Sequence, residues 1–135
     1  MAGYSGTPLP VKLNIRPGHR VLLDGTPSPD VLEELQPGVT LVTRLGSQPF
    51  DVGLLFAPDL RRLRRRFEPL ASHLTTAGAL WVAWPKKASG VTTDLTENVV
   101  RRHGLECGLV DVKVCAIDDT WSGLKFVRRL SDRGK

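Results

Sequence analysis

The sequence predicts one α/β domain: a three-layer, mostly parallel sheet of about six strands, with helices on its faces and an antiparallel hairpin at its end. Three observations lead to this fold class. Short apolar or β-branched runs recur along the chain, amphipathic helical stretches separate several of them, and a connector too short for a crossover joins the last two. A chain of 135 residues with 41% hydrophobic residues can bury one core but not two ordinary ones.

The first half of the chain supplies an arm, a short helix and three strands. Several prolines within residues 1–18 favour an extended arm on the surface and no helix. The pair Ser28-Pro29 is a helix-start pattern, because the hydroxyl caps free amides and proline suits the first helical position. We therefore expect a short helix over residues 28–35. The expected strands of this half are His19–Asp24, Val39–Thr43 and Phe50–Phe56.

The main amphipathic helix is expected after the third strand. Asp59 can cap its start, and apolar residues then recur at helical spacing over residues 60–74. Pro69 should kink or split this helix, because proline removes an amide donor and clashes with the preceding turn. Gly78 should mark its end.

The rest of the chain predicts one more helix and three strands. Asp94, with Glu97 three residues later, can begin a helix that ends near Gly104. The tail from Ser131 to Lys135 is expected to be disordered, after a single domain over residues 1–130. The expected strands are Ala79–Trp84, Leu109–Ile117 and Leu124–Leu130, the last two forming the hairpin.

One joint leaves the direction of the second strand open. The link Leu45–Pro49 is shorter than the dozen or so residues that a parallel crossover usually needs. Either this link runs fully extended or the second strand is antiparallel. The sequence does not choose between the two.

The charge of the chain favours an anionic partner without requiring one. Lys and Arg outnumber Asp and Glu by 19 to 14, which gives a net charge of +5. Much of the excess lies in an arginine cluster opposite the apolar face of the main helix. This cluster either binds the phosphates of a nucleic acid or keeps the helix soluble. It consists of Arg61, Arg62, Arg64, Arg65 and Arg66.

Other features indicate a soluble cytoplasmic protein with no membrane segment. No stretch resembles a signal-peptide core or approaches the length of a membrane span. Cys107 and Cys115 lack a CxxC spacing and are expected to be reduced and buried. The three histidines, His19, His73 and His103, lack metal-ligand spacing. We therefore assign no metal site and no catalytic residue.

Three sequence blocks resemble a family of uncharacterised bacterial proteins, catalogued as a domain of unknown function. The blocks are MAGYSGTPLP, LWVAWPKKASGVTTDLTENVVR and GLVDVKVCAIDDTWSGLKFVRR. This resemblance covers nearly the whole chain and implies no activity.

The segments PFDVGLLF and LTTAGALWVAW, followed by a terminal hairpin, are also similar to class I methyltransferases. That resemblance implies a Rossmann-like, methyltransferase-like sheet, with S-adenosylmethionine over a glycine-rich turn after the first strand. Here the turn at Asp24 and Gly25 holds one glycine and two prolines, and Thr43 or Arg44 replaces the acidic residue expected after the second strand. The Asn/Asp-Pro-Pro-aromatic motif is reduced to Phe56–Asp59. We therefore expect no cofactor, with S-adenosylmethionine at Asp24 and Gly25 as the alternative.

The loop Pro85–Gly90 is the main candidate for a ligand site. It follows the carboxyl end of a strand, where open α/β sheets bind ligands, and it offers two ammonium groups, a hydroxyl and a glycine. A phosphate or a carboxylate suits it, although paired lysines in a loop can simply be solvated. The candidate residues are Trp84, Lys86, Lys87, Ser89 and Gly90.

The connector of the hairpin is a candidate partner surface. Its tip holds Asp118, Asp119, Trp121 and Ser122. Two carboxylates can serve acid–base chemistry or bind a metal, and an exposed Trp121 would favour a partner surface. The same residues can equally be ordinary turn formers, because Asp and Ser satisfy local backbone amides. Arg61, Arg62 and Arg65 offer a second surface of this kind.

These observations lead to three functional hypotheses. The first is a non-catalytic binding or regulatory domain for an anionic small molecule or a protein partner. The alternative is a divergent S-adenosylmethionine-dependent enzyme, and the second alternative is nucleic-acid binding through the arginine cluster. The sequence does not indicate the oligomeric state.

Overall fold

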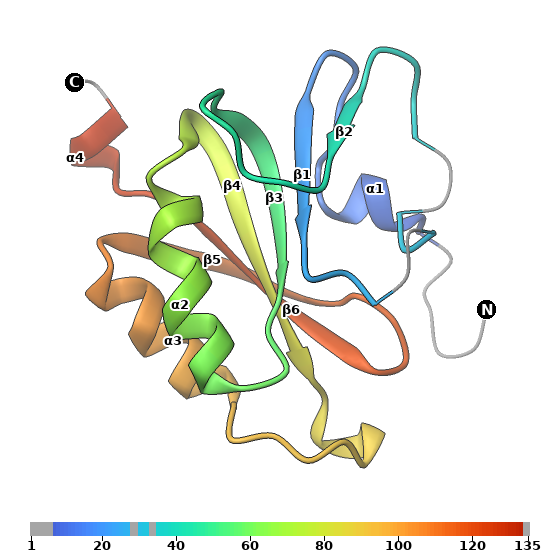
Figure 1. The fold of residues 1–135 in the computed structure, drawn as a ribbon, viewed down its shortest axis with the longest axis vertical. Helices are drawn as coiled ribbons and strands as arrows, with labels where there is room; N and C mark the ends of the chain where they lie inside the picture. The colour runs from blue at the N-terminus through green and yellow to red at the C-terminus, as the bar shows by residue number, and fades with distance from the viewer. Residues whose placement is uncertain (1–6, 28–29, 33–34, 134–135) are drawn as a thin grey trace.

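A six-stranded mixed sheet forms the centre of the molecule (Figure 1). The computed structural model describes residues 7–27, 30–32 and 35–133. The strand order is β2-β1-β3-β4-β6-β5, in which β1 to β4 are parallel and β6 is antiparallel to both of its neighbours. The predicted fold class is therefore confirmed. The strands are β1 Arg20–Asp24, β2 Thr40–Val42, β3 Phe50–Phe56, β4 Leu74–Pro85, β5 Leu109–Ala116 and β6 Trp121–Arg128.

Two layers cover the two faces of the sheet. Helices α2 (Leu60–Ala71) and α3 (Glu97–Glu106) pack on one face (Figure 1). Phe67 and Phe126 meet edge to face in the core on this side. The N-terminal segment with α1 (Leu9–Lys12) covers the other face, over a second core around Trp81. Strands β1 and β3 and most of β4 are thus buried on both faces, as their apolar sequences require.

The short link between β2 and β3 proves compatible with a parallel second strand. Residues 43–49 contain no helix and join two strands that flank β1 on opposite sides. Leu45, in this link, packs against the core on the α2 side. Because β2 has only three residues, the link can return to the start of β3 without a helical crossover.

Two expectations for the N-terminal half are wrong. The arm contains the one-turn helix α1, with Pro10 in its first turn, where the missing N–H removes no helical hydrogen bond. Leu13 and Ile15 behind it are buried, so this part of the arm belongs to the core. Of the helix expected over residues 28–35, residues 30–32 form a turn and residue 35 is not helical, and residues 28–29 and 33–34 lie outside the described part of the chain.

The main helix is shorter than expected and the strand after it is longer. Asp59 caps the start of α2, as predicted, and accepts a hydrogen bond from the backbone N–H of Arg62. The helix ends at Ala71 with Pro69 in its last turn, and β4 begins at Leu74. Gly78 therefore lies within β4. The β-branched Thr75 and Thr76 favour the strand, which the continuing apolar spacing concealed.

Helix α3 begins later than predicted and runs past Gly104. Its cap is Thr96, whose hydroxyl accepts a hydrogen bond from the N–H of Val99. A Cβ on Gly104 would meet the buried ring of Phe126 at 2.1 Å, so this glycine allows close packing on β6 and does not end the helix.

The C-terminal hairpin is confirmed, with β6 ending at Arg128. Of the tail expected to be disordered, Ser131 lies within the short helix α4 (Leu130–Arg133), and residues 134–135 lie outside the described part of the chain. In the described residues, no helix has both the length and the apolar character that crossing a bilayer requires. The expected cytoplasmic location stays a prediction.

Candidate functional site

The carboxyl ends of the parallel strands form one edge of the sheet, and two predicted site regions lie along it. Asp24 and Gly25 stand at the end of β1, and Trp84 stands near the end of β4. Strand β3 lies between them in the sheet. Open α/β sheets bind ligands at this edge. A ligand can bind at a strand end only if the side chains around that end leave it open.

An ion-pair network closes the end of β1. Asp24 is only 7% exposed and pairs with two arginines of α2. One carboxylate oxygen accepts a hydrogen bond from Nη2 of Arg62, and the other lies 2.7 Å from Nη2 of Arg66. Nε of Arg62 also donates to the carbonyl of Phe56, at the end of β3, over 3.0 Å. One guanidinium therefore joins the ends of two neighbouring strands.

The same guanidinium lies directly over Gly25. This glycine has φ of +72°, and a Cβ placed on it would meet Nη2 of Arg62 at 2.6 Å. Any side chain here would be strained and would displace the guanidinium. The sequence predicted Arg62 as part of a partner surface, whereas helix α2 directs its guanidinium back onto the end of β1. A partner surface over these arginines stays a prediction.

The residues at the end of β1 do not fit S-adenosylmethionine in this arrangement. The resemblance to class I methyltransferases implies a cofactor over the turn after the first strand. Here the Arg62 guanidinium fills the space above Gly25 and is held there by both Asp24 and the carbonyl of Phe56. The cofactor would need this side chain to leave.

A groove of about 530 Å³ opens at the end of β4. Trp84 and Pro85 line it from the end of β4, and the loop that leads to α3, called the groove wall below, lines the rest. Three of the predicted ligand residues, Trp84, Lys87 and Gly90, line it. Sequence reasoning missed several others, although their position at and just before the start of a helix was a readable signal. The missed residues are Val91, Thr92, Thr93, Leu95, Thr96 and Glu97.

The other predicted loop residues serve the turn itself. Ser89 lies in a short 3-10 turn, η1 (Lys87–Ser89), and its hydroxyl donates to the carbonyl of Lys86 over 2.6 Å. The backbone N–H of Lys86 donates to the carbonyl of Thr120 over 2.7 Å. This bond ties the loop to the hairpin tip, so the two candidate regions adjoin each other.

The groove wall is also tied to the start of α2. The hydroxyl of Thr93 donates to the carbonyl of Pro58 over 2.7 Å. A carboxylate oxygen of Asp94 accepts a hydrogen bond from the N–H of Leu60 over 2.8 Å. Asp94, predicted to cap its own helix, caps the neighbouring one instead.

The hairpin tip has the geometry of an ordinary turn. A carboxylate oxygen of Asp118 accepts hydrogen bonds from the N–H groups of Thr120 and Trp121, both over 2.8 Å. The ring of Trp121 packs edge to face on Phe56, with centroids 5.1 Å apart. Asp119 is exposed, and Ser122 lies in β6 opposite Trp84. A partner at this tip stays a prediction.

Of the arginine cluster, three members face solvent: Arg61, Arg64 and Arg65. Arg66, like Arg62, is engaged by Asp24. Nucleic-acid binding through the cluster stays a prediction and would rest on the three exposed side chains.

A thiol and an imidazole meet at the end of α3. Sγ of Cys107 lies 3.6 Å from Nε2 of His103, whose ring packs edge to face on Phe67. Burial lowers the pKa of His103 and raises the pKa of Cys107. The thiol therefore stays protonated at neutral pH, and the pair lacks the thiolate that a nucleophilic cysteine needs.

No model of a known protein family matches this chain, and no curated protein matches it. The resemblance to an uncharacterised bacterial family accordingly stays a prediction.

Several solved methyltransferase structures are similar to the chain. A magnesium protoporphyrin IX methyltransferase from Synechocystis PCC 6803 with bound SAH has a TM-score of 0.61 at 13% identity, over 88% of this chain and 78% of that one. A ribosomal protein L11 methylase from Lactobacillus delbrueckii subsp. bulgaricus has a TM-score of 0.59 at 13% identity, over 90% and 75%. A TehB-like SAM-dependent methyltransferase from Corynebacterium glutamicum has a TM-score of 0.59 at 9% identity, over 95% and 91%. At these identities the likeness shows the fold: this chain has the sheet of a class I methyltransferase.

Proposed function

We propose that this chain is a ligand-binding domain on a methyltransferase-type fold, and that it binds an anionic small molecule in the groove at the end of β4. The groove carries the proposal. Its volume of about 530 Å³ is in the range of sites that hold a small molecule, and Trp84 gives it an apolar wall beside hydroxyl groups and one ammonium.

The charges around the groove favour an anion. Lys87 is exposed at its rim, and the first turn of α3 faces it through Thr96 and Glu97. The N-terminal end of a helix carries partial positive charge. Glu97 is the acidic residue in the lining, and Arg101 neutralises it with Nη2 2.5 Å from its carboxylate.

A titration with adenosine monophosphate tests this proposal, because that probe joins a phosphate to a planar ring that can pack beside Trp84. We expect a saturable shift of the Trp84 indole resonance, and about tenfold weaker binding by the Lys87→Ala variant. Lys113→Ala removes an exposed lysine of β5 and should leave the affinity within about twofold. An indole that stays unmoved at about 10 mM probe would refute the proposal.

A second candidate is methyl transfer from S-adenosylmethionine. Two observations support it over a purely non-catalytic role: the similar solved structures are methyltransferases, and the turn at Gly25 stands where the fold implies the cofactor. The position of Arg62 opposes it.

Thermal unfolding with S-adenosylmethionine distinguishes the two candidates. A ligand that binds only the folded state raises its melting temperature. The first proposal expects no rise for the native chain. A saturable rise for the native chain, or for Arg62→Ala alone, would instead support methyl-donor binding, in the second case behind a displaceable arginine.

A further inference from the structure

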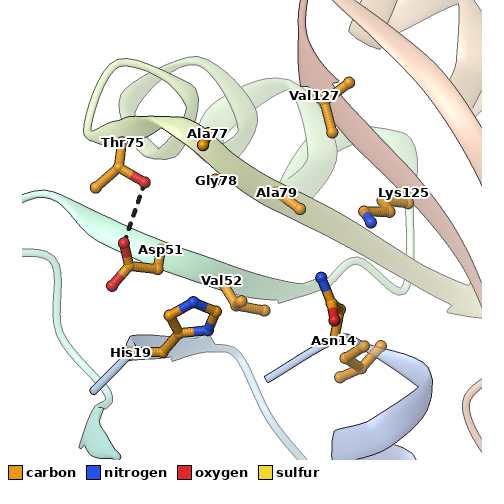
Figure 2. Close-up of a pocket in the computed structure, with 11 residues that line it drawn as sticks. Asn14, His19, Asp51, Val52, Thr75, Ala77, Gly78, Ala79, Lys125 and Val127 are labelled. Atoms are coloured by element: carbon orange, nitrogen blue, oxygen red, sulfur yellow. Dashed lines mark hydrogen bonds between the residues drawn. The ribbon is translucent and has the colours of Figure 1, made fainter. Parts of the chain in front are cut away.

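A second, smaller hollow lies at the opposite edge of the sheet, where β3 and β4 begin (Figure 2). Its volume is about 120 Å³, and four separate parts of the chain contribute to it: the N-terminal segment, β3, β4 and β6. The methyltransferase resemblance puts no ligand there. Its polar lining residues are Asn14, His19, Asp51, Thr75 and Lys125.

Arg16 orients two of these side chains so that they present donors. Its backbone N–H donates to Nδ1 of His19, and its Nε donates to Oδ1 of Asn14, each over 3.1 Å. These bonds occupy the acceptor atoms, so the amide nitrogen of Asn14 and Nε2 of His19 remain as donors. Figure 2 shows the Asn14 amide nitrogen on the side of Lys125. Asn14 holds this place with φ of +60°, which asparagine tolerates better than most residues.

Lys125 supplies a positive charge without a counter-ion. Its Nζ lies 5.9 Å from the ring centroid of the buried Trp81, and no carboxylate among the described residues forms an ion pair with it. Burial, and to a lesser degree Lys113, lower the pKa of Lys125. A half-buried ammonium without an anion is unfavourable, so an anion beside it would be stabilised.

Asp51 supplies a negative charge elsewhere in the same hollow. One carboxylate oxygen accepts a hydrogen bond from the N–H of Arg20 over 2.8 Å, and the other accepts one from the hydroxyl of Thr75 over 3.2 Å. Figure 2 shows Asp51 beside Thr75 and His19, away from Lys125. The hollow is therefore dipolar, with a fixed carboxylate on one side and an ammonium on the other.

We propose that this hollow binds a short α-amino carboxylate. The carboxylate of the ligand pairs with Lys125 and accepts from the amide of Asn14, while its ammonium group donates to Asp51. The hollow is small, about 120 Å³, so it favours a ligand of two or three carbons. The inference is independent of the function proposed for the groove at the end of β4.

Amide chemical shifts of the isotopically labelled native chain, titrated with glycine, test the site. We expect saturable shifts at Asn14, His19 and Asp51, with half-saturation in the low millimolar range. Acetate lacks the ammonium and methylamine lacks the carboxylate, so each should bind about tenfold more weakly. Unmoved amides at about 50 mM glycine, or acetate binding as tightly as glycine, would overturn the proposal.

Two lysine variants make the assignment specific. Lys125→Met keeps an unbranched apolar stem over Trp81 and should weaken glycine binding about tenfold. Lys113→Met removes the neighbouring exposed charge of β5 and should change it less than about twofold. Equal affinity of native and Lys125→Met chains would overturn the proposal. If Lys125→Met does not fold, the glycine and acetate titrations of the native chain decide it.

Discussion

The ends of β1 and β4 lie on the same edge of the sheet, yet one is closed and the other is open. At the end of β1, a buried carboxylate holds Arg62 over the turn, whereas at the end of β4 a groove of about 530 Å³ lies beside Trp84. The difference comes from the connecting segments. Helix α2 begins soon after β3 and sends long side chains back to the edge, while a loop separates β4 from α3. The fold supplies the edge, and these segments decide whether a ligand can reach it.

The largest loss of stability is expected from Asp24→Ala, which removes the carboxylate that closes the end of β1. The substitution leaves two arginines at the edge without their carboxylate, and removing one partner of a buried ion pair is strongly destabilising. Because both arginines are partly exposed, we expect a loss of about 2 to 3 kcal/mol in the free energy of unfolding, measured with urea. Asp119→Ala, at the exposed hairpin tip, should cost less than about 0.5 kcal/mol. If the Asp24→Ala chain were as stable as the Asp119→Ala chain, the ion pairs of Asp24 would not be what holds the end of β1 closed.

A somewhat smaller loss is expected from Gly104→Ala, in the helix that follows the open end. The added methyl group overlaps the ring of Phe126, which is fully buried and has no room to turn. We expect a net loss of about 2 kcal/mol after the gain in helix propensity, in the same urea measurement. Leu105→Ala changes an exposed neighbour on the same helix and should have a much smaller effect. If Gly104→Ala were instead more stable than the native chain, α3 would have to lie farther from the ring of Phe126 than the structure places it.

Asp94→Ala should remove one of the two hydrogen bonds that join the groove loop to the start of α2, at a cost of about 1 kcal/mol in stability, the usual effect of losing a cap. The carboxylate caps α2 from the groove wall, so the variant should weaken the closed end through a residue of the open one. Thermal unfolding measures the loss, with Thr92→Ala on the same loop as the matched control. Equal effects of the two variants would argue against the coupling.

The smallest expected effect is a pH dependence that His103 confers on α3. Burial lowers its pKa below the ordinary value of 6.5, so the unfolded chain takes up a proton before the folded chain does. Stability is therefore full above about pH 6.5 and falls as the pH drops toward the lower folded pKa. His103→Gln should flatten the profile of unfolding free energy between about pH 7 and pH 5. An unchanged slope would assign the acid sensitivity to other groups.

The parts of the fold that sequence reasoning found were those decided by local signals. Strand β3 was predicted residue for residue, because its apolar run is bounded by a proline on one side and a helix cap on the other. The boundary between α2 and β4 was misjudged, because Leu74 continues the helical spacing and yet begins a strand. Periodicity identifies a buried face but not the conformation that buries it.

For the candidate sites too, sequence reasoning found the residues that a local signal marks and missed those that only the fold brings together. Trp84, Lys87 and Gly90 were found because they lie at and just after the end of one strand, where this class of fold binds ligands. The pairing of Arg62 with Asp24 was missed, because 38 residues separate them and an arginine on a helix reads as a solvated charge. The hollow between Asn14 and Lys125 was missed for the same reason, since only the folded sheet brings its four segments together.

The strand order also sets when the sheet can be completed during synthesis. Strand β6 lies between β4 and β5, so the apolar edge of β4 has no partner until residues 121–128 have left the ribosome. A chain stopped before that point would present an unpaired central strand, which invites association with other chains. In the finished sheet β5 takes the outer position, where a register shift after Asp111 and the charge of Lys113 make it a poor template for a further strand. Once both of its strands are made, the hairpin thus covers the apolar edge of β4 and leaves the better protected strand β5 at the edge of the sheet.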